Sequence, residues 1–199
     1  MPNKKNKVKF NICNVHYAPI TAAEDGTVTF VAPVAMPGAV SISMDPTGEP
    51  ESFYADGVEY YVINNNQGYD GDLELAMIPE SFRTDILKEE ADANQVLVEN
   101  ANSETGSFAL LFEFDGDIRK IRHVLYNCSA SRPSIESKTN EEDKEVQTET
   151  LTVKARPLAN GYVKAKTGDS TTETVYNNWY KSVYEPNAEV QTASDETGE

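Results

Sequence analysis

The feature that most limits how this chain can fold is a recurring alternation of apolar and polar residues, interrupted by Asp-Gly turns. One run has apolar side chains at every second position, at Phe108, Leu110, Phe112 and Phe114. A period of two puts these side chains on one face of a β-strand. Residues 115–117 (DGD) then supply a turn in which glycine accepts a positive φ, and residues 118–128 return. We therefore predict a β-hairpin here, and another across residues 8–30 around the turn at 24–27 (EDGT).

Further strands are predicted by the same reasoning, at residues 40–44, 73–78, 95–100, 151–155 and 162–166. In the return strand, residues 118–128, the alternation breaks near His123. Either a β-bulge at that point or a strand end buried on both faces explains the break. Eight or more short strands at close spacing are typical of a β-sandwich or barrel, so the predicted fold class is mainly β.

Two short helices are predicted to interrupt the strands, at residues 79–90 and 171–182. Phe82 and Ile86 stand four residues apart in the first, and Val175 and Trp179 do so in the second. Three polar residues are available to bond the free amides of the second helix, namely Asp169, Thr172 and Glu173. Each helix has one apolar stripe, so we expect each to pack on a face of the sheet.

The length and charge of the chain limit its organisation and its partners. Its 199 residues suffice for one domain whose core needs no disulfide or metal. We predict that this domain covers residues 1–184 and that the acidic end, residues 185–199, is a disordered tail. Seventeen basic against thirty-three acidic residues give a net charge of −16, which argues against binding nucleic acid through a basic surface.

The cysteines and the N-terminal residues indicate the compartment in which such a chain is made. Cys13 and Cys128 are too few for a disulfide framework, and a zinc site would need both to converge with His16 and His123. We expect ordinary thiols instead, and no metal or cofactor. The lysine-rich start has no apolar run behind it, and no segment approaches the roughly 18 apolar residues of a membrane span. The expectation is a soluble chain made in a reducing compartment.

Residues 45–71 differ from the strands around them. They combine prolines, glycines and the run 64–66 (NNN) with five aromatic residues, Phe53, Tyr54, Tyr60, Tyr61 and Tyr69. So many turn-forming residues argue against packed core strands, whereas five aromatic side chains are too many for an idle loop. We predict a projecting arm whose aromatic residues contact a partner surface. A long hairpin that folds back onto its own domain is the alternative.

Motifs for catalysis are missing from the sequence. There is no glycine-rich phosphate loop, no GxSxG nucleophile elbow and no HExxH zinc motif. Pairs of acids such as Asp115 and Asp117 are expected by chance among thirty-three, and this pair lacks the downstream ligands of a calcium loop. Glycoside chemistry by two carboxylates stays open as an alternative, although no pair is singled out. With no catalytic residue predicted, we expect assembly or binding and not an enzyme.

Ordered motifs along the chain resemble those of one protein family, the major tail proteins of long-tailed, siphovirus-like bacteriophages. The matching segments are 14–18 (NVHYA), 37–43 (PGAVSIS), 53–57 (FYADG), 66–74 (NQGYDGDLE), 82–87 (FRTDIL), 96–100 (VLVEN), 122–128 (RHVLYNC), 148–151 (TETL) and 174–180 (TVYNNWY). The resemblance covers residues 7–184. No single motif identifies the family, but their number and order make coincidence a poor explanation.

The resemblance implies a β-sandwich or barrel-like tail tube fold with one or two short flanking helices. It implies a structural virion protein that self-assembles into stacked hexameric rings, the tail tube through which DNA is ejected. The implied partners are further copies of the chain, the tape-measure protein, the tail terminator and the distal tail proteins. Genomic DNA would pass through without specific binding, and no membrane is involved. The implied location is the virion tail, after assembly in the host cytoplasm.

Two details of such a tube can be assigned to this sequence. The aromatic arm is a candidate for the contact between rings or subunits, with Phe53, Tyr54, Tyr60 and Tyr61 as buried anchors. The polar stretch 134–149 is a candidate for the lumen wall because it lacks a core pattern. A secreted tube protein like that of type VI secretion, or another non-enzymatic bacterial β-domain, is the alternative, since fold alone does not separate them.

Overall fold

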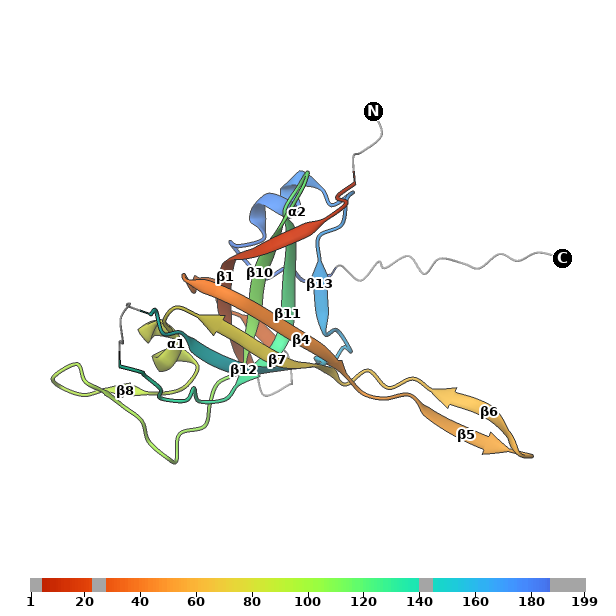
Figure 1. Cartoon of the computed structure of the whole chain (residues 1–199), viewed down its shortest axis with the longest axis horizontal. Coiled ribbons are helices and arrows are strands. Elements are labelled where there is room, and N and C mark those ends of the chain that lie inside the picture. Colours follow the sequence, from red (N-terminus) through yellow and green to blue (C-terminus); the bar gives the residue numbers. More distant parts are fainter. Residues whose placement is uncertain (1–4, 23–27, 140–144, 187–199) are drawn as a thin grey trace.

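The computed structural model describes residues 5–22, 28–139 and 145–186, and the fold in these residues is mainly β, as predicted. Nine strands form one curled sheet in the order β2-β1-β10-β11-β12-β7-β4, with β3 beside β1 and β13 beside β11. The sheet does not close into a barrel, and its two halves enclose the core as in a sandwich (Figure 1). One half consists of β1, β10 and β11, and the other of β12, β7 and β4.

The strands of the main sheet are β1 (Lys9–Ala22), β2 (Val28–Phe30), β3 (Val34–Ala35), β4 (Ala39–Thr47), β7 (Gly68–Leu75), β10 (Phe108–Gly116), β11 (Ile121–Ala130), β12 (Glu149–Arg156) and β13 (Lys164–Lys166). Two small ladders lie outside it. They pair β5 (Glu51–Ala55) with β6 (Val58–Ile63), and β8 (Glu90–Ala91) with β9 (Leu97–Val98). Of the strand predicted at 95–100, only the two residues of β9 are present. The Asp92 carboxylate accepts hydrogen bonds from the backbone amides of Asn94 and Val96, and these bonds turn the chain just before β9.

Both predicted hairpins are present. β1 pairs with β2 around residues 23–27, which lie outside the described part of the chain, and β10 pairs with β11. The bulge lies further along β11 than predicted: His123 is in register with Phe112, and the irregularity falls between Leu125 and Cys128. Gly116 does not have the positive φ that we predicted. It is glycine because an added Cβ would lie 2.4 Å from the Arg119 carbonyl oxygen.

β10 is buried on both faces, which explains its nearly continuous apolar sequence. Phe108, Leu110 and Phe112 point into the core between the two halves of the sheet. Ala109 and Leu111 point the other way, into a second core that the C-terminal segment, residues 167–186, forms with the outer face of β10 and β11. This segment therefore belongs to the domain and covers one half of the sheet.

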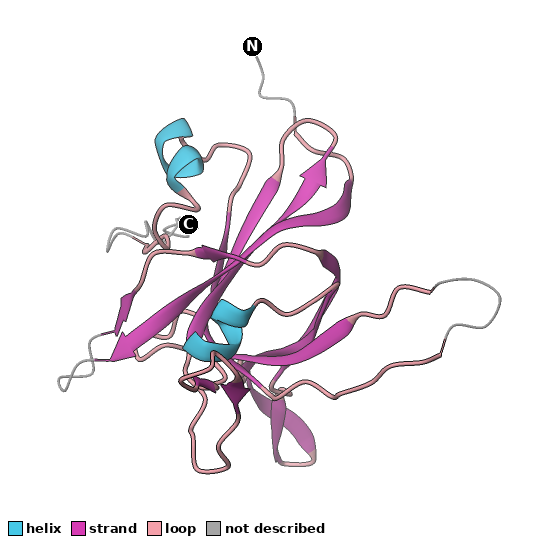
Figure 2. Ribbon diagram, turned by 90° about the vertical axis from the view of Figure 1, so that its left-hand side faces the viewer, coloured by secondary structure: helices cyan, strands magenta, loops and turns pink. Residues whose placement is uncertain are grey.

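The two helices, α1 (Glu80–Asp85) and α2 (Glu173–Asn178), are shorter than predicted but present the expected apolar side chains. Phe82 of α1 is fully buried and packs edge-on against Tyr17, with ring centroids 5.1 Å apart. No side chain caps α2, so the predicted bonds to its first amides are not formed; the Thr171 hydroxyl accepts the Gly168 amide instead. Figure 2 shows α2 towards the N-terminal end of β1 and α1 at the other end of the sheet.

Candidate assembly surfaces

The predicted arm is a two-stranded hairpin, β5 and β6, that extends away from the main sheet (Figure 1). Its tip is an Asp-Gly turn in which Asp56 (φ 53°) and Gly57 (φ 79°) both adopt the left-handed conformation. Such a turn matches the twist of two antiparallel strands, so the sequence specifies the hairpin locally. The aromatic side chains of the arm are largely exposed, Tyr60 at 72% and Phe53 at 58%. No described residue of the main sheet therefore covers them.

The register of the arm places four large apolar side chains on one face and two others, Tyr54 and Val62, on the opposite face. Phe53 lies opposite Tyr61, and the pairs formed by the neighbouring strand positions add Val58 and Ile63 to the same face. Ser52, whose hydroxyl donates to Glu59, lies on the other face. An exposed apolar stripe on a thin projection is unusual for a lone molecule and is typical of a contact surface.

Tyr69 does not belong to the arm, in contrast to the prediction. It lies in β7, half-buried against the core, and the Lys164 ammonium bonds its hydroxyl and stands 4.3 Å from its ring centroid. The residues before and after the hairpin are also in the main sheet, where Thr47 pairs with Gly68. The root needs glycine at position 68, because its φ is +109° and an added Cβ would lie 1.9 Å from the Ala155 carbonyl oxygen.

A column of carboxylates forms a second surface, on the outer face of β4, β7 and β12. Asp70, Asp72 and Glu74 occupy every second position of β7 and point outward, whereas Leu73 and Leu75 point into the core. Hydroxyls from the strands on both sides bond the column: Thr152 of β12 donates to Asp72 at 2.8 Å, and Ser41 of β4 donates to Glu74 at 2.8 Å.

These bonds keep the carboxylates charged. Hydrogen bonds from Thr148 and Ser41 lower the pKa of Glu74. The Arg156 guanidinium bonds Asp70 and lowers the pKa of that carboxyl as well. The outer face of β7 therefore presents acidic side chains among hydroxyls at Asp72 and Glu74, whereas Asp70 lies beside Lys154 and Arg156.

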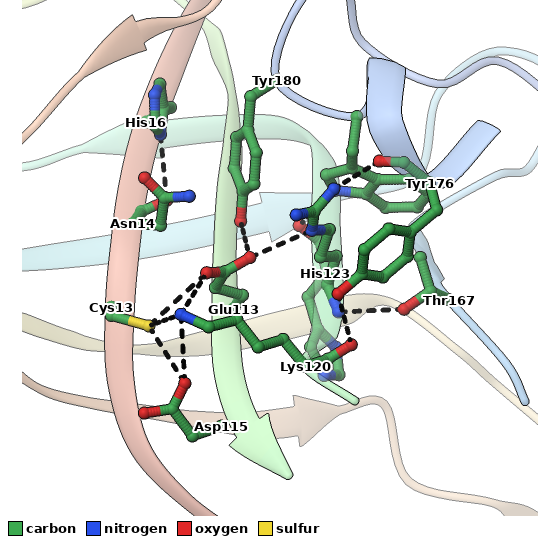
Figure 3. A network of polar contacts seen from close by, with 12 residues as sticks. Cys13, Asn14, His16, Glu113, Asp115, Lys120, His123, Thr167, Tyr176 and Tyr180 are labelled. Carbon is green, nitrogen blue, oxygen red and sulfur yellow. Dashed lines mark hydrogen bonds and ion pairs between the residues drawn. The ribbon is translucent and has the colours of Figure 1, made fainter. Parts of the chain in front are cut away.

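The opposite half of the sheet is closed by a polar network around Glu113 (Figure 3). This carboxylate is only 2% exposed and accepts bonds from Arg122 Nε at 3.0 Å, Lys120 Nζ at 2.9 Å and the Tyr180 hydroxyl at 3.3 Å. The bond to Glu113 raises the pKa of Lys120, so its ammonium group keeps its charge. Arg122 also donates to the Tyr176 carbonyl and stacks on that ring, 3.8 Å from its centroid. The network ties the C-terminal segment to β10 and β11.

The sequence profile of the phage tail tube protein family matches residues 4–194, almost the whole chain. The chain belongs to this family. Among solved structures, the cap that terminates the tube of the anti-feeding prophage is similar, with a TM-score of 0.45 and 10% identity over 84% of this chain and 98% of that one. No curated protein sequence matches the chain. The predicted family is thus confirmed, and this tail tube protein is a structural component of a phage tail.

Two features of the tail tube protein escaped the sequence interpretation although the sequence held a signal for them. The alternation of acids with Leu73 and Leu75 marked Asp72 and Glu74 as the outer face of a half-buried strand, but we treated acidic pairs as chance. The Asp56-Gly57 pair marked the tip of the arm. The position of Glu113 in a second core had no sequence signal, because it depends on where the C-terminal segment folds back.

The other candidate residues serve packing. Cys128 is buried in the core, and burial raises its pKa to about 12. His123 stacks on Phe112 with centroids 5.1 Å apart. In residues 5–22, 28–139 and 145–186, no three His, Cys, Asp or Glu side chains are grouped so as to hold a metal ion. No helix in those residues has the length and apolar character that crossing a membrane requires.

Proposed function

We propose that this tail tube protein assembles into hexameric rings that stack around a lumen, and that phage DNA is ejected through this lumen. The observation that carries the proposal is that one half of the sheet has a covered outer face and the other half an exposed one. The C-terminal segment covers the outer face of β10 and β11, whereas the outer face of β4, β7 and β12 is bare and carries mostly carboxylates and hydroxyls, with Lys154 and Arg156 beside Asp70 at one end. A sheet with one covered and one polar face suits the wall of a tube.

The bare face has the chemistry of a DNA conduit. Asp72 and Glu74 repel phosphates, and Asp45 and Asp70 offset the two bases beside them, Lys154 and Arg156, so the polymer meets no unbalanced positive patch on which to stall. The hydroxyls of Ser41, Ser43 and Thr152 keep the surface wetted without adding positive charge. We place the lumen wall here and not at residues 134–149. Of that stretch, residues 140–144 lie outside the described part of the chain, and Glu149 is engaged by Arg83 at 2.8 Å.

Ring closure can use the free strand edges. β4 ends the sheet on one side and pairs only with β7 among the described residues. On the other side, β1 pairs with β3 through His16 and Tyr17 and with β2 from Ile20 onward, which leaves the edge of its first half open. Pairing β4 of one copy with β1 of the next is a heterologous contact that closes by rotation and removes both edges.

The first test asks whether the purified full-length protein forms tubes. We expect sedimentation velocity to show large assemblies as concentration rises, and negative-stain images to show stacked rings. A protein that stays monomeric at high concentration and in the presence of the other tail proteins would contradict the proposal.

A second test locates the lumen. Ser43→Cys places a thiol opposite Asp72 on the bare face, and Asn94→Cys places one on the exposed β8–β9 ladder as the matched control. A maleimide carrying a polymer too large to enter the bore should label both variants as monomers, but only Asn94→Cys in tubes. Equal labelling of Ser43→Cys in tubes and monomers would place this face elsewhere.

A further inference from the structure

Another exposed surface of the chain is apolar, as the arm is, but has the opposite charge. We call it the N-terminal tip, and it consists of residues 5–10 together with Ile118 of the adjoining turn. Val8 and Phe10 are each 55% exposed, and Ile118 is 47% exposed. Large apolar side chains this exposed on one small surface are typical of a contact site.

The charges of the two surfaces are complementary. Residues 5–10 contain three lysines and no acid, and the adjoining turn adds one carboxylate, Asp117, which accepts the Lys7 amide at 2.8 Å. Residues 48–67, the arm with its two connections, contain four acids and no base. Among the described residues, no ion pair involves Lys5 or Lys7 of the tip, or Glu49 or Glu51 of the arm. Residues 150–168 also contain bases and no acid, but two of the four, Arg156 and Lys164, are already bonded to Asp70 and Tyr69. In a chain of net charge −16, the acidic arm therefore has few other basic surfaces to bind.

The two surfaces cannot meet within one molecule. Figure 1 shows the start of β1 at the top of the structure, whereas the arm points away from it at the lower right. The root of the arm is fixed in the main sheet through Thr47 and Gly68. A contact between the surfaces is therefore a contact between copies, and it is heterologous, because different patches meet.

We propose that the acidic aromatic arm of one copy docks on the basic N-terminal tip of another copy. The apolar stripe of the arm covers Val8 and Phe10, while the lysines of the tip lie beside the arm's carboxylates and tyrosine rings. This inference rests on the proposed function, because it takes assembly as given and names the surface that the arm contacts. Repeated from copy to copy, the contact adds subunits in one direction, as a growing tube requires.

Charge reversal tests the pairing in the full-length protein. The tip variant is Lys5→Glu/Lys7→Glu, and the arm variant is Glu49→Lys/Glu51→Lys; all four side chains are exposed. The tip variant makes the tip net negative beside the acidic arm, and the arm variant leaves the arm without net charge and places two lysines opposite the basic tip, so we expect the critical concentration of each for assembly to rise about tenfold. Circular dichroism of each variant should match the wild type, since no described side-chain contact is lost.

Complementation separates this pairing from a general effect of charge. An equimolar mixture of the two variants, and the protein that carries all four substitutions, should assemble within about threefold of the wild-type concentration, because opposite charges meet again. Glu90→Lys/Glu104→Lys, at exposed positions in β8 and in the loop after β9, makes the same change in net charge as the arm variant and should have little effect. Added salt should raise the wild-type critical concentration and lower that of the single-surface variants.

The outcomes distinguish this inference from the proposed function. If the wild type never assembles, both fail. If the wild type assembles but neither single-surface variant is impaired, or the mixture is as impaired as its components, the tip is not the partner of the arm and the tube proposal stands. If the arm variant alone is impaired and a variant of the tip is not, the arm docks on another tail protein or another surface, and the inference is wrong.

Discussion

Replacing Trp179 tests whether the C-terminal segment is an integral part of the domain. The indole is 2% exposed and packs in the second core against the outer face of β10 and β11. Its N–H points to the His123 carbonyl oxygen at 3.4 Å, and its ring stacks on Tyr184 with centroids 5.5 Å apart. Truncating a buried tryptophan to alanine removes this apolar surface and leaves a cavity, which costs about 3–5 kcal/mol. A domain of this size should then melt about 6–20 °C lower.

The assay is urea unfolding of the monomer, followed by circular dichroism. Fluorescence is unsuitable, because Trp179 is the only tryptophan of the chain. The matched control is Tyr60→Ala, which also removes a large aromatic side chain, but one that is 72% exposed on the arm. We expect this control to change the free energy of unfolding by less than about 0.5 kcal/mol.

The comparison can refute the reasoning in two ways. A loss below about 1 kcal/mol for Trp179→Ala, with an unchanged denaturant dependence, would mean that the C-terminal segment adds little to the folded domain. Equal losses for Trp179→Ala and Tyr60→Ala would mean that the arm is packed in solution, which would contradict its exposed position in the structure.

Three further predictions concern the arm, pH and the buried ion pairs. Tyr60→Ser/Tyr61→Ser should leave the circular dichroism unchanged but lower the yield of sedimenting tubes; normal yields would refute the role of the arm. Burial, with nearby lysines, lowers the pKa of His123 to about 4, so from pH 6.5 down to 4 the unfolded state binds the proton first. Stability should fall by up to about 3 kcal/mol over that range, and chemical unfolding of His123→Gln should lack this component. Arg122→Met leaves a buried carboxylate without its main partner and should cost about 3 kcal/mol or more in urea unfolding, whereas Arg156→Met, at an exposed pair, should cost less than about 1 kcal/mol.

Much of the fold was predictable because its signals are local. The alternation along residues 108–114 predicted a strand, and two Asp-Gly turns predicted the β1–β2 and β10–β11 hairpins. The aromatic and turn-forming residues of the arm predicted a projection, and in the structure β5 and β6 form an exposed hairpin. These features depend on neighbours within a few residues, which the sequence lists directly.

The remaining features depend on contacts between distant segments. In the sequence, Tyr69 has the same kind of neighbours as the other arm aromatics. In the structure, a lysine 95 residues later in the chain bonds its hydroxyl and fixes it at the root of the arm. Glu113 looks like an exposed residue of an alternating strand, and it is buried because Tyr180 and Arg122 reach it from other elements. The bulge in β11 lies where β12 and β13 divide the edge of that strand between them, a sheet order that local alternation does not encode.

The construction of the arm connects the fold to assembly. A two-stranded hairpin without a covered face is only marginally stable by itself, so the arm of a free copy derives its order from its turn and its root. Both are specified: the Asp56-Gly57 turn sets the register, and Gly68 and Tyr69 fix the root against β12 and β13. A pre-shaped arm loses less conformational entropy on docking than a disordered loop would. The apolar stripe is therefore exposed in a defined geometry before any partner arrives, which favours rapid, directional addition of the next copy.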